Sequence, residues 1–161
     1  MIRNLVLATA LFAPLAATAQ ELPNAPYFPL ALAIQAADAA LKACAAEGHN
    51  VSVAIMTRDG ATKVLLKADN SGPHTVTSAQ GKAFTSAAMG RDTAGLAEFI
   101  ASQPSNNGLR DMDSRMVIQA GGLPIRFGDA LVAGIGVGGA PTGAIDAGCA
   151  VAGLQAIGAA E

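Results

Sequence analysis

Apolar residues at helical spacing mark the first regular element of the chain. From Pro29, apolar residues recur three or four positions apart through an alanine-rich stretch that ends at Gly48, a pattern that predicts an amphipathic helix. Two short, largely apolar runs follow at 51–57 and 62–67, separated by the dipeptide Asp59-Gly60. Such runs on either side of an Asp-Gly turn predict a β-hairpin.

The rest of the chain predicts two more helices, a group of strands and a closing helix. The sequence predicts a helix over 77–89 that ends at Gly90. It also predicts a shorter helix that has Asp92 as its N-cap and reaches about Ser102. Three apolar runs separated by glycine-containing turns predict an antiparallel meander; they cover 116–120, 123–127 and 131–137. The last predicted helix covers 144–157.

Together these elements predict one fold class. Their order is helix, two strands, two helices, three strands, helix, and the hairpins between strands are short. The pattern lacks the long alternation of strands and helices that builds a doubly wound parallel sheet. We therefore expect an α/β (α+β) sandwich, in which helices pack on a five-stranded antiparallel sheet.

The first nineteen residues have the pattern of a secretory signal peptide. Arg3 supplies a positive charge, the run 5–16 is almost entirely apolar, and Ala17 and Ala19 are the small residues that a signal peptidase recognises. An apolar run of about twelve residues is too short to span a membrane, which takes about twenty. We therefore expect 1–19 to be cleaved, no stable membrane anchor, and a periplasmic or secreted mature protein.

Composition indicates one compact domain after the leader. Of 161 residues, 52% are apolar and 14% are charged, which predicts a core of small aliphatic side chains. Residues 20–28 contain Pro23 and Pro26, so we expect an extended N-terminal arm there, followed by a single domain over 29–161. A chain this apolar predicts a homo-oligomer, and the net charge of −2 argues against nucleic-acid binding.

The two cysteines, Cys44 and Cys149, fall on the apolar faces of the first and last predicted helices. A thiol in that position packs as a small hydrophobic group, while the oxidising compartment expected for an exported chain permits a disulfide. The pair would form a bond if the two helices lie side by side on one face of the sheet. It would then close a loop of about 105 residues and stabilise the fold by about 4 to 5 kcal/mol.

A glycine-rich motif, Gly134-x-Gly136-x-Gly138-Gly139, stands between a predicted strand and the last helix. This placement resembles a nucleotide-binding fingerprint, but the second strand–helix–strand unit and the Gly-Lys-Ser/Thr sequence of a phosphate-binding loop are missing. The better interpretation is structural, because small residues let a central strand approach a helix closely.

His74 is the residue best suited to binding a metal. It stands in the segment 71–75, where glycine and proline fix a loop just before a helix, so its imidazole is presented from a rigid turn. A solvent-exposed loop histidine without a ligand is the alternative. His49 follows the helix-ending Gly48, where a histidine caps carbonyl groups. The histidines and cysteines lack zinc-ligand spacing and no nucleophile is paired with a base, so we assign no catalytic residues.

Several motifs taken as a set resemble the GlcG/HbpS family of haem-binding proteins. The set consists of Pro29-Leu30-Ala31-Leu32-Ala33, Val51-Ser52-Val53-Ala54-Ile55, Gly72-Pro73-His74-Thr75, Lys82-Ala83-Phe84-Thr85, Gly121-Gly122-Leu123-Pro124-Ile125 and Gly134-Ile135-Gly136-Val137-Gly138-Gly139-Ala140-Pro141. The resemblance covers about residues 29–158. It implies a five-stranded, profilin-like layout, kinship with the C-terminal domain of PduO-type corrinoid proteins, and a dimer or larger ring.

The resemblance also implies a haem site. A tetrapyrrole site needs an apolar slot, an axial ligand to the iron and cations for the propionates. His74, with Thr75 beside it, is the expected metal ligand. Met89 and Met112 are further soft ligands, and Lys82 or Arg91 would pair with propionates.

Three functions follow from this resemblance. The leading one is an exported haem-binding carrier, buffer or sensor partner. The first alternative is a binding module for a corrinoid or a small organic acid, with His74 and Arg126 as polar contacts. The second alternative is an enzyme for a small acid or a tetrapyrrole, although the sequence contains no identifiable catalytic set.

Overall fold

The computed structural model describes residues 24–160, so the expected signal peptide, 1–19, lies outside the described residues. Residues 24–29 have no regular secondary structure. The elements that follow are α1 (Leu30–Ala46), β1 (Ser52–Thr57), β2 (Thr62–Lys67), α2 (His74–Met89), α3 (Thr93–Ser102), the 3-10 helix η1 (Pro104–Asp111), β3 (Gly122–Phe127), β4 (Ala130–Gly138) and α4 (Gly143–Ala156). Within residues 24–160, no helix is long and apolar enough to cross a membrane.

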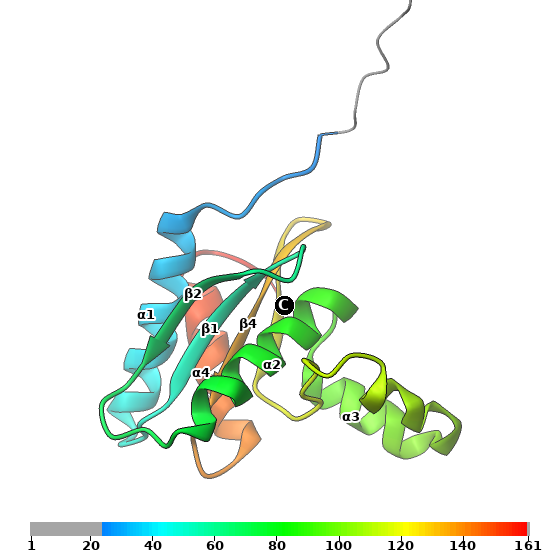
Figure 1. Ribbon diagram of the computed structural model, residues 1–161. Helices are drawn as coiled ribbons and strands as arrows, with labels where there is room; N and C mark the ends of the chain where they lie inside the picture. Colours follow the sequence, from blue (N-terminus) through cyan, green and yellow to red (C-terminus); the bar gives the residue numbers. More distant parts are fainter. Residues whose placement is uncertain (1–23, 161) are drawn as a thin grey trace, which may run out of the picture.

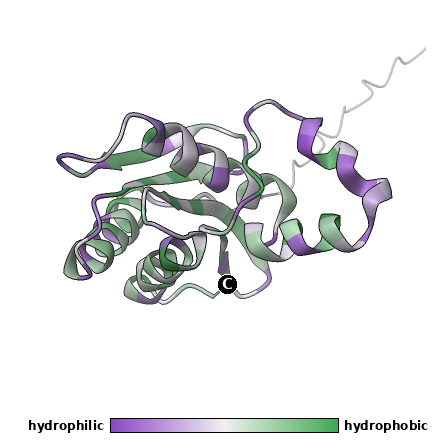
Figure 2. Ribbon diagram, turned by 90° about the horizontal axis from the view of Figure 1, so that it is seen from below, coloured by the Kyte–Doolittle hydropathy of each residue, from purple (hydrophilic) through white to green (hydrophobic). Residues whose placement is uncertain are grey.

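The fold is an antiparallel sheet between two helical layers. The strand order is β2-β1-β4-β3, with every neighbouring pair antiparallel. Helices α1 and α4 cover one face of the sheet and α2 crosses the other, with α3 and η1 projecting beyond it (Figure 1). Figure 2 shows the apolar strands lying between these layers. The α+β class and the antiparallel pairing are as the sequence predicts.

The predicted five-stranded sheet is wrong by one strand, because the sheet has four strands in the part of the chain that the structure describes. The predicted first strand of the meander, 116–120, is an irregular segment on the surface of α2. The backbone N–H of Val117 donates to the Thr85 hydroxyl over 2.9 Å and to the Gly81 carbonyl over 3.4 Å. Since this N–H is bonded to α2, it is not available to a neighbouring strand, and the segment forms no part of the sheet.

Alternate residues of the central strands build two separate cores. Val53 and Ile55 of β1 face α1 and α4, while Ala54 and Met56 face α2, as the two-residue period of a strand requires. The first core is the larger, and it also contains Ile135 of β4. The second core is thin, because mostly alanines lie between α2 and the sheet.

Glycines in β4 let α2 lie directly on the strand. A Cβ at Gly136 would collide with the Ala79 carbonyl oxygen and the Ala83 nitrogen, and a Cβ at Gly134 would collide with the Ala83 carbonyl oxygen. A Cβ at Gly138 would lie 2.6 Å from the Ser78 hydroxyl. These close contacts confirm the structural interpretation of the glycine motif, since side chains on this face would push α2 away from the sheet.

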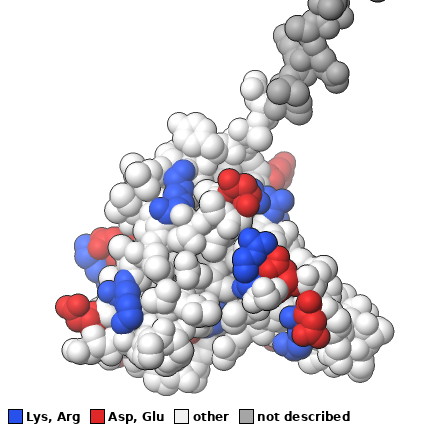
Figure 3. Space-filling model, in the orientation of Figure 1, with Lys and Arg blue, Asp and Glu red and all other residues white. Residues whose placement is uncertain are grey.

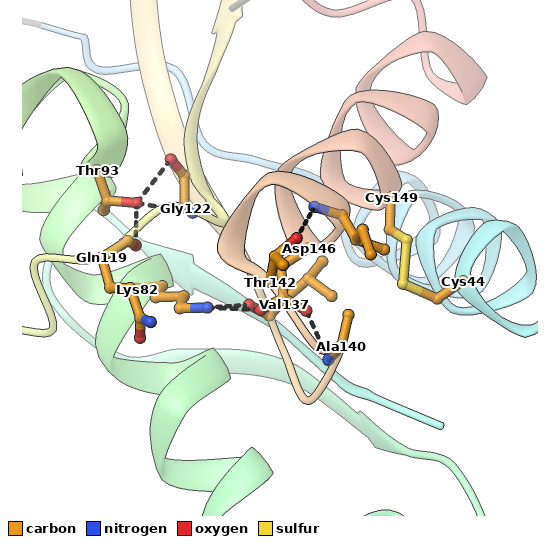
Figure 4. Close-up of polar contacts among 11 residues, drawn as sticks. Cys44, Lys82, Thr93, Gln119, Gly122, Val137, Ala140, Thr142, Asp146 and Cys149 are labelled. Carbon is orange, nitrogen blue, oxygen red and sulfur yellow. Dashed lines mark hydrogen bonds and ion pairs between the residues drawn. A yellow bond between two sulfur atoms is a disulfide. The ribbon is translucent and has the colours of Figure 1, made fainter. Parts of the chain in front are cut away.

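A disulfide joins the two helices on the opposite face. Helices α1 and α4 lie side by side, and Cys44 and Cys149 form a disulfide across them with their Cα atoms 5.5 Å apart (Figure 4). A Cβ at Gly153 would lie 2.7 Å from the Ala36 carbonyl oxygen, so the two helices are closely packed. The sequence predicts this disulfide on the condition that the first and last helices lie side by side, and in the structure they do.

Candidate functional site

His74 is the first residue of α2, and its imidazole is exposed. The ring lies over Gly72, where a Cβ would be only 2.7 Å from the imidazole Cε1. Pro73 has the φ of −65° that suits the start of a helix. Pro73 fixes the backbone just before His74, and Gly72, which has no Cβ, leaves room for the imidazole; the histidine begins the helix rather than preceding it.

Thr75 anchors this helix start instead of facing a ligand. Its hydroxyl donates to the Gly72 carbonyl over 2.8 Å and shares a hydrogen bond of 2.8 Å with the Ser52 hydroxyl of β1. Its side chain is only 1% exposed. Thr75 therefore fixes the first turn of α2 to the sheet, and its effect on His74 is one of positioning.

A groove runs along the face of α2 that follows His74. Its walls on the helix are Thr77, Gln80, Gly81 and Phe84, which share one face because they are three or four residues apart. His74 stands three residues before Thr77 on the same helix face, but it does not line the groove, and its imidazole packs over Gly72. The remaining wall residues are Met56, Gly60, Thr62, Ser114, Arg115 and Val117, and the groove has a volume of about 320 Å³.

The groove has apolar walls and a cation at its rim. The Arg115 guanidinium lies 4.0 Å from the centre of the Phe84 ring, a cation–π distance. It also pairs with Asp113, with Nη2 and Oδ2 2.7 Å apart. The hydrogen bond from Arg115 lowers the pKa of the Asp113 carboxyl to about 2 and raises the pKa of Arg115. Asp113 therefore holds the guanidinium in place, while most of the arginine side chain remains exposed.

Lys82 lies in the interior, where it cannot reach a surface propionate. Its Nζ is 2.7 Å from Asp146 Oδ2 and 3.0 Å from the Val137 carbonyl oxygen (Figure 4). The other oxygen of Asp146 accepts a hydrogen bond from the Ala140 N–H over 3.0 Å. The lysine and aspartate side chains are 1% and 4% exposed. This ion pair joins α2, the end of β4 and α4, so Lys82 is a structural residue.

Met89 and Arg91 lie at the far end of α2. The helix has sixteen residues, and its two ends are about 22 Å apart at 1.5 Å per residue. Met89 is half-buried, and Met112, which is exposed, follows η1. The structure thus spreads the six residues named for the haem site from one end of α2 to beyond the other, and among them only His74 has an exposed polar group on the helix face that continues into the groove.

The other residues named from the sequence also lie away from the groove walls. His49 is half-buried in the turn between α1 and β1, and Arg126 of β3 donates to the Gly90 carbonyl over 2.9 Å. His74 and Arg126 therefore lie near opposite ends of α2. They do not form the joint small-acid site expected from the sequence.

The groove walls, above all Phe84 and Arg115, are not among the site residues that the sequence predicts. One signal for them was present: Gly81 interrupts a helix in which alanine would be more favourable. A Cβ at Gly81 would collide with the Val117 side chain, so the glycine marks the place where residues 114–117 pack onto α2.

Charges and metal ligands are sparse over the described residues. Figure 3 shows acidic and basic groups scattered over the visible face, with no basic stripe that would follow a nucleic acid. Within residues 24–160, no group of three or more His, Cys, Asp or Glu side chains is arranged to hold a metal ion.

Comparison with known proteins gives consistent matches. A family model described as haem degrading protein HbpS-like matches residues 28–155. The crystal structure of a double mutant of Streptomyces reticuli HbpS is 40% identical, with a TM-score of 0.79, and the match covers 91% of this chain and 97% of that one. A crystal structure of HbpS is also 40% identical, with a TM-score of 0.80 and coverage of 88% and 97%.

A more distant match shares the fold. The crystal structure of a PduOC:Heme complex is 22% identical, with a TM-score of 0.77, covering 84% of this chain and 98% of that one. No curated protein matches the chain.

Proposed function

The chain belongs to the HbpS-like family, and from this premise we propose that it is an exported haem-binding protein that holds its ligand along the α2 groove. The family is described as haem degrading, and the distant structural relative PduOC was crystallised with heme. The observation that carries the proposal for this chain is an exposed histidine one helical turn before an apolar groove, on the same face of α2.

The chemical types of the residues in and beside the groove suit a tetrapyrrole. Met56, Phe84 and Val117 supply apolar walls, Arg115 supplies a cation for a propionate, and His74 supplies a nitrogen for the iron. A porphyrin brings four ligands to its iron, so one protein imidazole completes a stable site where a bare ion would need several side chains. Haem supplies one-electron and O₂ chemistry when it is bound.

The protein acts in this proposal as a carrier, buffer or sensor partner. His74 and Arg115 are both exposed, so a ligand held between them keeps one edge in solvent and remains accessible to an acceptor. Two further alternatives, a corrinoid module and a tetrapyrrole enzyme, become outcomes of the tests below.

Titration with haemin tests the site. Wild-type protein should develop a saturable Soret band, and His74→Ala should shift or weaken it because the axial nitrogen is lost. Thr77→Trp should reduce affinity by filling the groove from an exposed position. His49→Ala removes the other histidine, and Gln155→Trp places an indole on exposed α4, so both controls should bind as the wild type does.

Three results would contradict parts of this proposal. If no saturable band appears, haem is not the ligand, and a corrinoid titration would follow. A band that His74→Ala and Thr77→Trp leave unchanged would place haem elsewhere on the protein. Loss of the bound Soret band with release of iron, in the presence of a reductant and O₂, would indicate degradation rather than transport or storage.

Export is supported by the Cys44–Cys149 disulfide, since such bonds persist in oxidising compartments. Cleavage after Ala19 would give a mature chain that begins at Gln20. The mass of the intact protein from a periplasmic extract or from culture medium checks this, and a mass that includes the first nineteen residues would contradict it.

We also propose that the protein self-associates. Tyr27, Leu30 and Ile34 are 80%, 53% and 50% exposed, and the last two share one face of α1 at a spacing of four residues. Exposed apolar groups gathered in this way are typical of an interface. Light scattering should give a mass at least twice that of one chain, and a monomer mass would contradict this proposal.

A further inference from the structure

Two arginines from different elements meet at a second pocket, at the C-terminal end of α2. The pocket has a volume of about 260 Å³ and is lined by Gly90, Arg91, Asp92, Pro124 and Arg126. Gly90 ends α2 in the left-handed conformation, and Asp92 is the N-cap of α3. The pocket therefore lies at the corner between two helices and β3, far from the α2 groove.

The geometry of β3 directs Arg126 into this corner. Pro124 and Arg126 are two residues apart, so they share the face of the strand that points to α2. The pairing of β3 with β4 shifts register between Ile125 and Arg126, but the unpaired residue is Val132 of β4, so the alternation along β3 is kept. The Nη2 of Arg126 donates to the Gly90 carbonyl over 2.9 Å. This contact uses one N–H of the five that a guanidinium carries.

Arg91 is held just as firmly from the other side. Its Nη2 donates to the Gly95 carbonyl over 3.2 Å, and its guanidinium lies 5.3 Å from the centre of the Phe99 ring. Both contacts fix the plane of the group and leave other N–H donors unused. Two pre-positioned guanidinium groups thus line one small pocket.

The charge of this pocket is not balanced by the residues that line it. In the described part of the chain, neither arginine forms an ion pair with a carboxylate. Asp92 is committed to the start of α3, where its Oδ1 accepts from the Gly95 N–H over 2.6 Å. Two guanidinium groups and one carboxylate leave a net charge of +1, which a single negative group would neutralise.

We propose that this pocket binds a small organic monocarboxylate, with the carboxylate oxygens accepting hydrogen bonds from Arg91 and Arg126. Guanidinium groups match a carboxylate through paired N–H donors. The volume lies below the roughly 300 to 1,000 Å³ of sites for drug-sized ligands, which suits a small ligand. A dianion would place surplus negative charge beside Asp92. The pocket should therefore bind a monocarboxylate more tightly than a dicarboxylate or the phosphate dianion.

Nuclear magnetic resonance of the arginine Nε–H groups tests this site directly. The ¹⁵N-labelled mature protein is titrated with sodium acetate, with sodium phosphate and with sodium malonate, at constant ionic strength set by chloride. Acetate should shift the Nε–H resonances of Arg91 and Arg126 saturably, and more strongly than either dianion. Arg110, an exposed arginine in η1, should remain unshifted.

Variants distinguish the pocket from general attraction to a cation. Arg91→Gln should weaken acetate binding about tenfold or more, the size expected for a hydrogen bond to a charged group. Arg126→Lys keeps the charge but loses the planar set of donors, so it should also weaken binding, while Arg110→Gln should not. The dispersion of the amide spectrum shows for each variant whether the fold is intact.

Three outcomes would overturn the proposal: shifts that never saturate, equal affinity for Arg91→Gln and the wild type, or a preference for phosphate or malonate. Haemin titration of Arg91→Gln separates this proposal from the haem site. Because Arg91 lies beyond the far end of α2 from His74, the Soret change should match that of the wild type.

Discussion

The buried ion pair between Lys82 and Asp146 allows a quantitative test of what holds α2 in place. Lys82→Met would remove the ammonium and leave the carboxylate of Asp146, 4% exposed, with the Ala140 N–H as its remaining hydrogen-bond donor. Removing one partner of a buried pair costs about 3 to 5 kcal/mol, because the other charge stays desolvated. That is a large part of the roughly 5 to 15 kcal/mol that stabilises a typical domain.

A second substitution should recover much of this loss. In the double variant Lys82→Met with Asp146→Asn, no buried charge remains, and the new amide oxygen still accepts from the Ala140 N–H. Neutral replacements of buried pairs are often tolerated, so the double variant should be more stable than Lys82→Met alone. Lys42→Met is the matched control, because its pair with Asp38 is exposed, at 75% and 47%, and such pairs contribute about 0.3 to 0.5 kcal/mol.

Guanidinium unfolding under non-reducing conditions measures these free energies, with the slope checked for two-state behaviour. A loss below about 1 kcal/mol for Lys82→Met would show that the pair is not a desolvated unit. A double variant no more stable than the single one would show that geometry, and not an unpaired charge, sets the cost.

Three further predictions concern other parts of the fold. Replacing both cysteines of the α1–α4 disulfide with alanine should lower the free energy of unfolding by about 4 to 5 kcal/mol, and a reductant should destabilise the wild type but not this variant. Gly136→Ala should cost about 1 to 3 kcal/mol by pushing α2 off β4, whereas Gly148→Ala, with no atom within 4 Å of the new Cβ, should be neutral or stabilising in thermal unfolding. The pKa of Asp113 is lowered to about 2 from the ordinary 3.8, so its pair with Arg115 contributes fully to stability above pH 3.8 and is lost as the pH falls through 2. The Arg115 Nε–H resonance should therefore be constant from pH 5 to 8, and a titration midpoint near pH 5 would contradict this.

Local patterns in the sequence predict the helices and the hairpins. They do not indicate which distant segments of the chain contact one another. The Asp59-Gly60 turn and the glycine after α2 act within a few residues, so their effect is visible in the sequence. The apolar run 116–120 had the composition of a strand, but its backbone bonds to α2 residues more than thirty positions earlier. Periodicity contains no information about such a partner.

The candidate site shows the same division. His74 was identified because glycine and proline around it fix the backbone locally. Lys82 was expected to pair with a haem propionate, yet it is buried against Asp146, which lies 64 residues away in the sequence. Arg115 reaches Phe84 from an irregular segment, and no spacing rule connects the two. Charge partners and groove walls depend on how the layers pack, and that is set by the whole chain.

The disulfide between α1 and α4 also determines what a protease can do to this molecule. The bridge encloses residues 44–149, which include the exposed turns of η1. A single cut in η1 would therefore give two polypeptides that stay tethered, and they would separate on electrophoresis only after reduction. Because the tether keeps the halves at a high effective concentration, reassembly of the nicked protein would be independent of dilution.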